Sequence, residues 1–343
     1  YAEDARVIFA GVYDPDLERA QMLADTHGAP AFDTLNALFA ASDIVTIASP
    51  PSFHASNALP ALLAGKHVLV EKPLATNATE GRELVRIATE RGRVLACGHQ
   101  ERLVFEAMGL FNTPEKPVRI ESVREGPWTG RSADVSVTLD LMVHDLDLAL
   151  KLMAGKPDHV SAKARAVHGK AADSIEATLT FGGGEALFTS SRVADDRRRT
   201  MRAVYPSGEV KVDFLARTFE NTTPFALNAA FAETRIGADP LGANVRRFIS
   251  AVLGEDGLPV HRLPQRPRLD ARSAEAPDEV RRARGRPLGI DDKGRQPGIG
   301  LRRGGVTADV DPGDVADRGG VPASPLPALP DWIYARVSIM RLL

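Results

Sequence analysis

Asp140 and His144 are the pair of residues whose types and spacing first suggest chemistry. Residues four apart lie on one face of a helix, so this carboxylate can orient the imidazole, or both can face one substrate. Two such side chains also suggest a metal site, but no third ligand follows at a fitting spacing. A histidine in an apolar stretch such as residues 139–148 is more often a core residue. The pair alone therefore leaves catalysis and core packing open.

A second group of polar residues directly follows apolar runs. Asp14 comes after residues 6–13, and an acidic residue at that position accepts the ribose hydroxyls of a dinucleotide and repels a 2′-phosphate. The others are Ser49, Pro50, Pro51, His54, Glu71 and Lys72. The carboxyl ends of strands in an α/β sheet face the crevice that binds ligands. Each residue alone also has an ordinary explanation, as a turn or helix cap, a loop, or a surface lysine.

The elements that must position these residues alternate between strand and helix. Short apolar runs are typical of strands buried on both faces, and amphipathic stretches with a glycine at the end are typical of helices. The predicted strands are residues 6–13, 44–48, 67–70 and 93–97, and the predicted helices are 17–28, 35–39, 54–64 and 78–91. This order predicts an α/β Rossmann-like domain with a parallel sheet over residues 1–102. The glycine-rich turn of such a domain is absent, so we expect one βα unit to be missing before Tyr1.

The pattern changes after this region. Successive strands with few helices between them predict an antiparallel sheet, and glycines at 182–184 and 208 supply turns. The predicted strands are residues 118–124, 159–167, 174–181, 186–193, 200–205 and 209–214, and the predicted helices are 139–153 and 241–253. Residues 103–254 are therefore expected to form an α+β domain with an open, mainly antiparallel sheet.

Composition sets outer limits on function. The net charge of -2 gives no reason to expect nucleic acid or a membrane surface as a partner. Cys97 is the one cysteine, in an apolar run, which predicts a buried thiol and no internal disulfide. No apolar stretch is long enough for a membrane span and no signal peptide is visible, so we expect a cytoplasmic protein. Residues 255–343 are rich in Arg, Pro and Gly and are expected to be a disordered or frame-shifted tail without a chemical role.

Five motifs in order resemble the Gfo/Idh/MocA oxidoreductase family over residues 6 to about 250. They are GVYD at 11–14, SPP with His54 at 49–54, EKPLA at 71–75, GHQER at 98–102 and DLMVHDLD at 140–147. The resemblance implies a Rossmann domain, a second domain that binds substrate and forms homo-oligomers through its sheet, and a nicotinamide cofactor between the two. It also implies that Lys72, Asp140 and His144 converge at the nicotinamide ring, and that the Lys72–Pro73 peptide is often cis. The segment containing Gln100 and Arg102 is implied to lie near cofactor and substrate.

These implications predict an NAD(P)-dependent dehydrogenase of a sugar, nucleotide sugar or cyclitol. His144 would take the hydroxyl proton, Lys72 would stabilise the developing alkoxide, and Asp140 would hold substrate or orient His144. No metal is required, and Asp14 favours NAD, with NADP also possible. Trp128, Arg102 and Arg131 are candidate substrate contacts. Two other functions stay open: an NAD-dependent glycosidase on the same fold, and an inactive or cofactor-sensing remnant.

Overall fold

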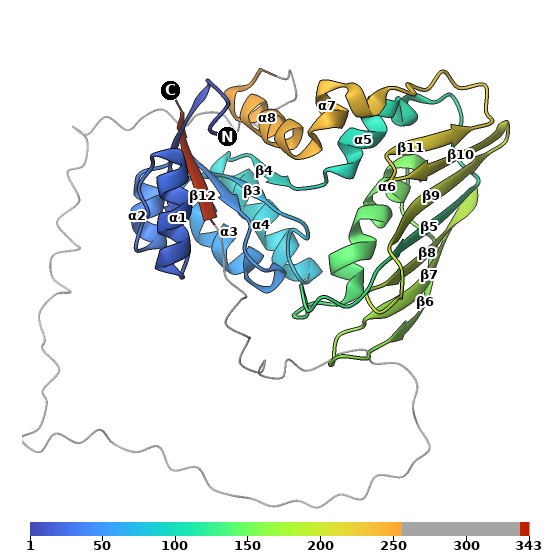
Figure 1. Cartoon of the computed structure of the whole chain (residues 1–343), viewed down its shortest axis with the longest axis horizontal. Coiled ribbons are helices and arrows are strands. Elements are labelled where there is room, and N and C mark those ends of the chain that lie inside the picture. The colour runs from blue at the N-terminus through green and yellow to red at the C-terminus, as the bar shows by residue number, and fades with distance from the viewer. Residues whose placement is uncertain (256–336, 343) are drawn as a thin grey trace, which may run out of the picture. The chain divides into compact units, whose positions relative to one another are not determined.

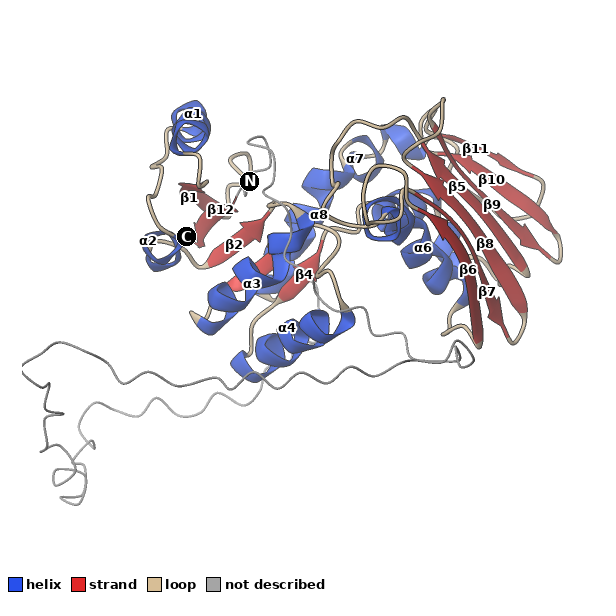
Figure 2. Ribbon diagram, turned by 90° about the horizontal axis from the view of Figure 1, so that it is seen from below, coloured by secondary structure: helices blue, strands red, loops and turns tan. Residues whose placement is uncertain are grey.

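The computed structural model describes residues 1–255 and 337–342, which contain two β-sheets (Figures 1 and 2). The first sheet has the strand order β1-β12-β2-β3-β4. Its strands are β1 (Val7–Tyr13), β2 (Ile44–Ile47), β3 (His67–Val70), β4 (Leu95–Cys97) and β12 (Val337–Leu342), and the helices between them are α1 (Leu17–His27), α2 (Leu35–Ala40), α3 (His54–Leu63) and α4 (Ala78–Arg91). Strands β2, β3 and β4 pair in parallel, which confirms the predicted Rossmann-like sheet.

Strand β3 shows why these short strands consist of apolar residues throughout. Successive side chains of a strand point to opposite faces of the sheet. Val68 and Val70 pack into a cluster with α3 and α4, whereas Leu69 packs on the other face against Phe248 and Ile249. The latter two come from α8 (Pro240–Leu253), a helix late in the sequence. Both faces of the sheet are therefore covered, and an alternating pattern would bury polar groups.

Three of the four helices in the first region begin at a capping side chain, and two of these end at a glycine. The side chains of Asp16, Thr34 and Asn77 accept backbone N–H groups at the starts of α1, α2 and α4. Gly28 and Gly92 adopt the left-handed conformation at the ends of α1 and α4. These caps fix the positions at which each chain segment turns back toward the sheet.

Strand β12 lies between β1 and β2 and pairs antiparallel with both. Its register on β1 runs from Val7 opposite Leu342 to Tyr13 opposite Val337. This strand belongs to the segment 255–343 that was expected to be an unstructured tail. The remainder of that expectation, for residues 256–336 and 343, lies outside the described residues.

The second sheet is mixed, with the strand order β11-β10-β9-β5-β8-β7-β6. Its strands are β5 (Arg119–Glu125), β6 (His159–Arg165), β7 (Ser174–Phe181), β8 (Gly184–Ser191), β9 (Arg198–Tyr205), β10 (Gly208–Asp213) and β11 (Thr218–Asn221). The β5–β8 ladder is parallel and the other ladders are antiparallel, so the predicted mainly antiparallel sheet is confirmed. Strand β11 was not predicted from the sequence.

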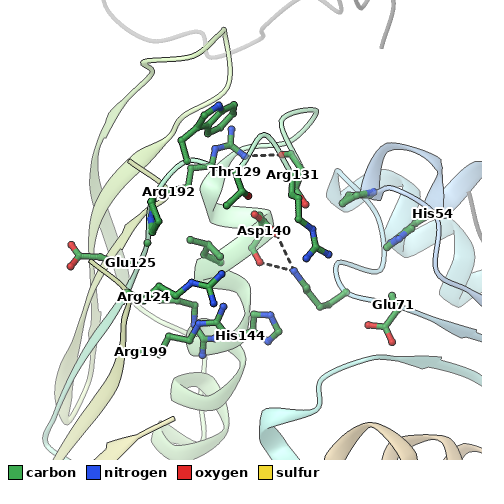
Figure 3. Close-up of a pocket in the computed structure, with 18 of the residues that line it drawn as sticks. His54, Glu71, Arg124, Glu125, Thr129, Arg131, Asp140, His144, Arg192 and Arg199 are labelled. Atoms are coloured by element: carbon green, nitrogen blue, oxygen red, sulfur yellow. Dashed lines mark hydrogen bonds and ion pairs between the residues drawn. The ribbon is translucent and has the colours of Figure 1, made fainter. Parts of the chain in front are cut away.

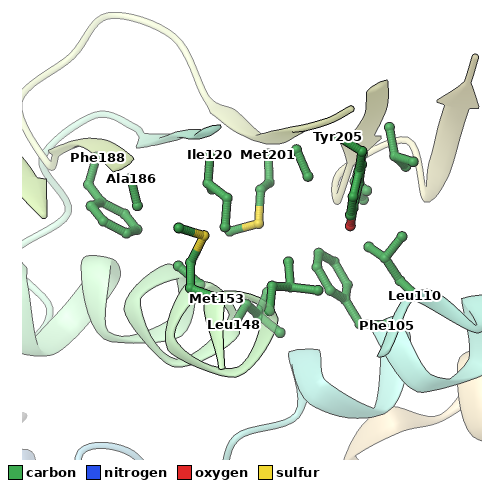
Figure 4. Close-up of a cluster of buried hydrophobic side chains, with 14 of the residues drawn as sticks. Phe105, Leu110, Ile120, Leu148, Met153, Ala186, Phe188, Met201 and Tyr205 are labelled. Carbon is green, nitrogen blue, oxygen red and sulfur yellow. The ribbon is translucent and has the colours of Figure 1, made fainter. Parts of the chain in front are cut away.

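Helices cover the inner face of the second sheet. They are α5 (Glu101–Met108) and α6 (Val143–Met153), and a π-helical turn, Thr138–Met142, leads into α6. The predicted helix 139–153 therefore begins as a π turn, and α5 was not predicted at all. The short helix α7 (Arg235–Ala238) packs against α5 and α8. Figure 4 shows the core between α5, α6 and the sheet, where Phe105 and Met153 meet Ile120, Phe188 and Met201. This packing holds α6 and its polar residues at a fixed place over the sheet.

Candidate functional site

A cavity of about 370 Å³ lies between the carboxyl ends of β2 and β3 and one end of the second sheet (Figure 3). Its lining is mostly polar and comes from both sheets, the loop before α6, and α6 itself. The lining residues are Ser49, Pro51, His54, Glu71, Lys72, Arg124, Glu125, Gly126, Pro127, Trp128, Thr129, Arg131, Ser132, Asp140, Leu141, His144, Arg192, Arg197 and Arg199. The residues expected to be catalytic, Lys72, Asp140 and His144, thus border one space.

Lys72 reaches across the cavity to the π-helical turn. Its Nζ donates to the carbonyl oxygen of Asp140 at 2.6 Å and lies 3.3 Å from the carboxylate Oδ1 of the same residue. The Lys72–Pro73 peptide is cis, as the family resemblance implied. An ammonium group has three N–H donors, and two of them are used here. One donor remains for a ligand oxygen.

His144 is oriented by Glu101 and not by Asp140. The Nδ1 atom of His144 lies 2.6 Å from Oε2 of Glu101, which is the first residue of α5. Burial raises the pKa of Glu101, but the hydrogen bond to His144 and the charges of His144 and Arg124 outweigh it and lower the pKa to about 2. The carboxylate is therefore ionised at neutral pH and accepts the Nδ1 proton, which directs a free Nε2 lone pair away from it.

Arg124 fixes Glu101 from behind. Its Nη1 donates to Oε1 of Glu101 at 3.2 Å. Its Nε donates to Oδ2 of Asp145 and its Nη2 donates to Oδ1 of Asp145, both at 2.9 Å. The side chains of Arg124 and Asp145 are each 2% exposed. A planar guanidinium that makes a two-pronged bond to one carboxylate has little freedom to move. Asp145 is therefore a buried partner in this network.

The ends of β2 and β3 are tied together by His54. Its ring nitrogens lie 2.5 Å from the carbonyl oxygen of Pro73 and 2.8 Å from that of Ser49. Burial lowers the pKa of His54, so the neutral ring donates to one of these oxygens and packs against the other. This side chain is 1% exposed, so it holds the two loops in register. Beside it, burial raises the pKa of Glu71.

Other predicted site residues do not line this cavity. Asp14 is buried at the carboxyl end of β1, where its Oδ1 accepts the N–H of Asp16 at 2.9 Å. Arg102 makes an ion pair with Asp147, with its Nε 2.6 Å from Oδ2. Pro50 and Gln100 are also absent from the lining. The binding roles expected for these four residues stay predictions.

The cavity wall formed by the second sheet and the loop before α6 contains both predicted and unpredicted residues. Trp128 and Arg131 were named as candidate contacts, and both line the cavity. The indole of Trp128 stacks on His168 with ring centroids 4.2 Å apart. Arg124, Arg192, Arg197 and Arg199 were not named before. Arg192 donates to Asp173 at 2.7 Å.

Among the described residues, no group of three His, Cys, Asp or Glu side chains is arranged to hold a metal ion. The helices within that same part of the chain include none long and apolar enough to cross a membrane. The single thiol, Cys97, is half-buried, and burial raises its pKa to about 12. The thiolate is therefore scarce at neutral pH, which agrees with a core role for this cysteine.

Known proteins resemble the chain over both sheets. Residues 2–99 match the family model GFO_IDH_MocA, described as "Oxidoreductase family, NAD-binding Rossmann fold", and residues 104–211 match the GFO/IDH/MocA C-terminal domain. The UDP-N-acetylglucosamine 3-dehydrogenase of Acidithiobacillus ferrooxidans is 37% identical over 214 residues, which are 61% of this chain and 67% of that protein. D-glucoside 3-dehydrogenase of Escherichia coli is 37% identical over 102 residues, 29% of each chain.

Solved structures give the same result for the fold. A structure of the Acidithiobacillus ferrooxidans enzyme superposes with a TM-score of 0.65 at 35% identity, over 71% of this chain and 81% of that one. The two family models match residues 2–99 and 104–211, which include strands of both sheets. The likeness therefore covers the cavity walls as well as the Rossmann-like region.

Proposed function

Since the chain belongs to the Gfo/Idh/MocA family of NAD-binding oxidoreductases, we propose that its cavity oxidises or reduces a sugar-like substrate. The reaction moves a hydride between NAD(P) and a secondary alcohol or ketone of a sugar, nucleotide sugar or cyclitol. One observation carries this proposal: Lys72, its partner Asp140, and His144 border the same space at the ends of β2 and β3. An ammonium and an oriented imidazole in one cavity are the groups that oxidation of an alcohol requires.

The residues at the first sheet's edge fit the nicotinamide end of the cofactor. Ser49, Pro51, Glu71 and Lys72 border the cavity from the carboxyl ends of parallel strands, the side on which α/β sheets bind nucleotides. NAD(P), when bound, takes up the hydride in the oxidation and returns it in the reduction. The protein groups must therefore bind the reacting oxygen and move its proton.

His144 is the proposed base. Glu101 accepts its Nδ1 proton, so the Nε2 atom has the lone pair that takes the proton of the substrate hydroxyl. The nearby charge of Glu101 stabilises the imidazolium that forms. In the reverse direction the imidazolium returns the proton from the same atom. Glu101 acts through His144 and is a positioning residue.

Lys72 is the proposed electrophilic group. Its remaining N–H donor binds the substrate oxygen and stabilises the negative charge that develops as the proton leaves. Asp140 holds the ammonium in place through its carbonyl and carboxylate oxygens, so the charge is present before substrate arrives. The proposed chemistry needs no metal, because the ammonium supplies the positive charge.

Replacing Lys72 tests the proposal. Lys72→Ala should lower turnover about a hundred- to a thousandfold, because that is the usual effect of removing one charge-stabilising donor. Turnover is measured by NADH absorbance with UDP-N-acetylglucosamine, the substrate named for the similar dehydrogenase, and then with other sugars and cyclitols. NADH binding, followed by fluorescence, should be largely retained. Lys163→Ala, on the exposed strand β6, is the matched control. Near-normal turnover of Lys72→Ala would remove Lys72 from the mechanism.

We also propose that copies of the chain associate through the second sheet. Helices pack on its inner face, and on its outer face a groove of about 600 Å³ lies over β5, β9, β10 and β11. Arg202, Glu121 and Glu209 form ion pairs along this outer face. Light scattering of the full chain should give a multiple of the monomer mass. A monomer at micromolar concentration would contradict this part of the proposal.

A further inference from the structure

Three guanidinium groups of the cavity have no ion-pair partner among the described residues. Arg131, Arg197 and Arg199 line it, and none of them makes a side-chain hydrogen bond or an ion pair with any described residue. The cavity's other cations are all paired. Lys72 has Asp140, Arg124 has Asp145 and Glu101, and Arg192 has Asp173.

The register of the second sheet makes this arrangement unfavourable for folding. Arg199 on β9 lies directly opposite Arg124 on β5, and like charges opposite each other destabilise a sheet. The next pair along, Arg198 opposite Glu125, is complementary, with Nη2 and Oε2 3.0 Å apart. Burial and the charges of Arg124 and Arg197 lower the pKa of Arg199, and the charges of Glu101 and Asp145 oppose them only in part. Arg199 is thus a partly buried cation without an ion pair among the described residues.

The inner face of the sheet explains how the arginines reach the cavity. On β9, alternate residues Tyr205, Ala203 and Met201 are buried in the core, and Arg199 continues the same face beyond it. On β5, Ile120 is followed by Ser122 and Arg124 in the same way. The apolar core therefore ends in a cationic wall, which lies beside His144 in Figure 3 and lines the same cavity as Lys72.

No acidic side chain of the lining offsets this wall. Asp140 is paired with Lys72, Glu125 with Arg198, and burial raises the pKa of Glu71 toward its neutral form. A phosphate or diphosphate brings up to two negative charges and several acceptor oxygens, and guanidinium groups bind such groups with two-pronged geometry. A single carboxylate would leave most of the surplus charge unmatched.

We propose that Arg131, Arg197 and Arg199 form a subsite for a phosphate or diphosphate group attached to the sugar substrate. The sugar then lies with its reacting carbon near Lys72 and His144, and its phosphoryl group against the end of β9. This inference rests on the proposed function for the direction of the sugar, but the subsite itself requires no turnover. Phosphorylated or nucleotide-linked sugars are thereby preferred over free sugars and cyclitols.

Titration of the full chain with inorganic pyrophosphate and with UDP, without cofactor, tests the subsite. Arg199→Gln and Arg197→Gln should each weaken binding about tenfold or more, the effect of losing one charge-assisted hydrogen bond. Arg202→Gln is the matched control, because it removes the same charge on the outer face of β9, where its partners Glu121 and Glu209 do not line the cavity. It should change affinity by less than about threefold. Failure of the chain to bind either probe, or equal affinity in Arg199→Gln, would overturn the proposal.

Two further measurements separate this inference from its alternatives. NADH affinity should be unchanged in Arg199→Gln, and a parallel loss would assign the wall to the phosphates of the cofactor instead. The melting temperature of Arg199→Gln should change little, because the charges of Glu101 and Asp145 offset the repulsion between Arg199 and Arg124, and a large fall would mean that Arg199 has a structural role. If turnover is absent but Arg199-dependent pyrophosphate binding is present, the proposed function fails and the subsite stands.

Discussion

The two walls of the cavity, one at the first sheet and one at the second, differ in where their polar residues lie relative to the strands. At the first sheet, the polar residues follow the ends of strands that are apolar throughout, and Lys72 comes directly after Val68–Val70. At the second sheet, the polar residues lie within the strands, where Arg124 and Arg199 continue the face that forms the core. The first wall is made by loops beyond a buried sheet, whereas the second is made by charges placed inside one. The second wall therefore depends much more on exact ion pairing.

Among the substitutions considered for the two walls, Arg124→Met should have the largest effect on stability. Arg124→Met should destabilise the chain by about 3–5 kcal/mol, because it leaves Asp145 buried without a counter-charge. Chemical unfolding measures the change. The control is Arg202→Met on the outer face of β9, where exposed pairs with Glu121 and Glu209 contribute about 1 kcal/mol or less. Equal effects in the two variants would mean that the Arg124 network is not what holds this wall.

The matching change at the first wall is Leu69→Ala. Leu69 is 1% exposed and packs against Phe248 and Ile249 of α8. Its truncation should cost about 2–5 kcal/mol through lost burial and the cavity left behind. Turnover below the melting temperature should be little changed, because Leu69 does not reach the cavity. A loss of turnover without a loss of stability would show that the two sides of β3 are not independent.

The two walls also differ in how far the sequence predicts them. Strands β2 and β3 are short apolar runs followed by polar residues, so both the strand and the exposed edge are evident from local order. The wall at β5 and β9 depends on register, since Arg124 and Arg199 are 75 residues apart and meet only because Ile120 pairs with Ala203. No local sequence pattern predicts that strand register. The alternation of Arg199, Met201, Ala203 and Tyr205 is the one signal that was present, and it marks a face without saying what lies opposite.

Glu101 shows a second limit. It was quoted within the motif GHQER, but α5 was not predicted, and Asp140 was expected to hold substrate or orient His144. The segment is short and follows directly after β4, so its helical period covers only two turns. Glu101 and His144 are 43 residues apart in sequence, and the packing of α5 beside α6 brings them within 2.6 Å. Contacts between helices of this kind require the tertiary structure.

The substitution Glu101→Gln tests whether the charge of Glu101 contributes to the reaction through His144. It should lower kcat about ten- to a hundredfold with little change in KM, since the imidazole loses the charge that fixes its tautomer while the shape is kept. Steady-state kinetics with NAD measures both constants. Glu106→Gln on the same helix, which loses an exposed pair with Arg247, is the control. A rise in KM at constant kcat would mean that Glu101 serves substrate binding instead.

The pH dependence of stability gives the finest test, because it isolates the charge of Glu101 from its shape. The pKa of this carboxyl is lowered from 4.5 to about 2 in the folded chain. A lowered pKa contributes stability that is fully present above the unfolded value and is lost as the pH falls through the folded value. The free energy of unfolding of the native chain should therefore exceed that of Glu101→Gln by on the order of 1 kcal/mol near pH 6. This difference should shrink steadily between pH 4.5 and 2, as followed by chemical unfolding at each pH. A difference that is constant across that range would locate the effect of the substitution in packing and hydrogen bonding, and the charge of Glu101 would then have no part in holding His144 to the second sheet.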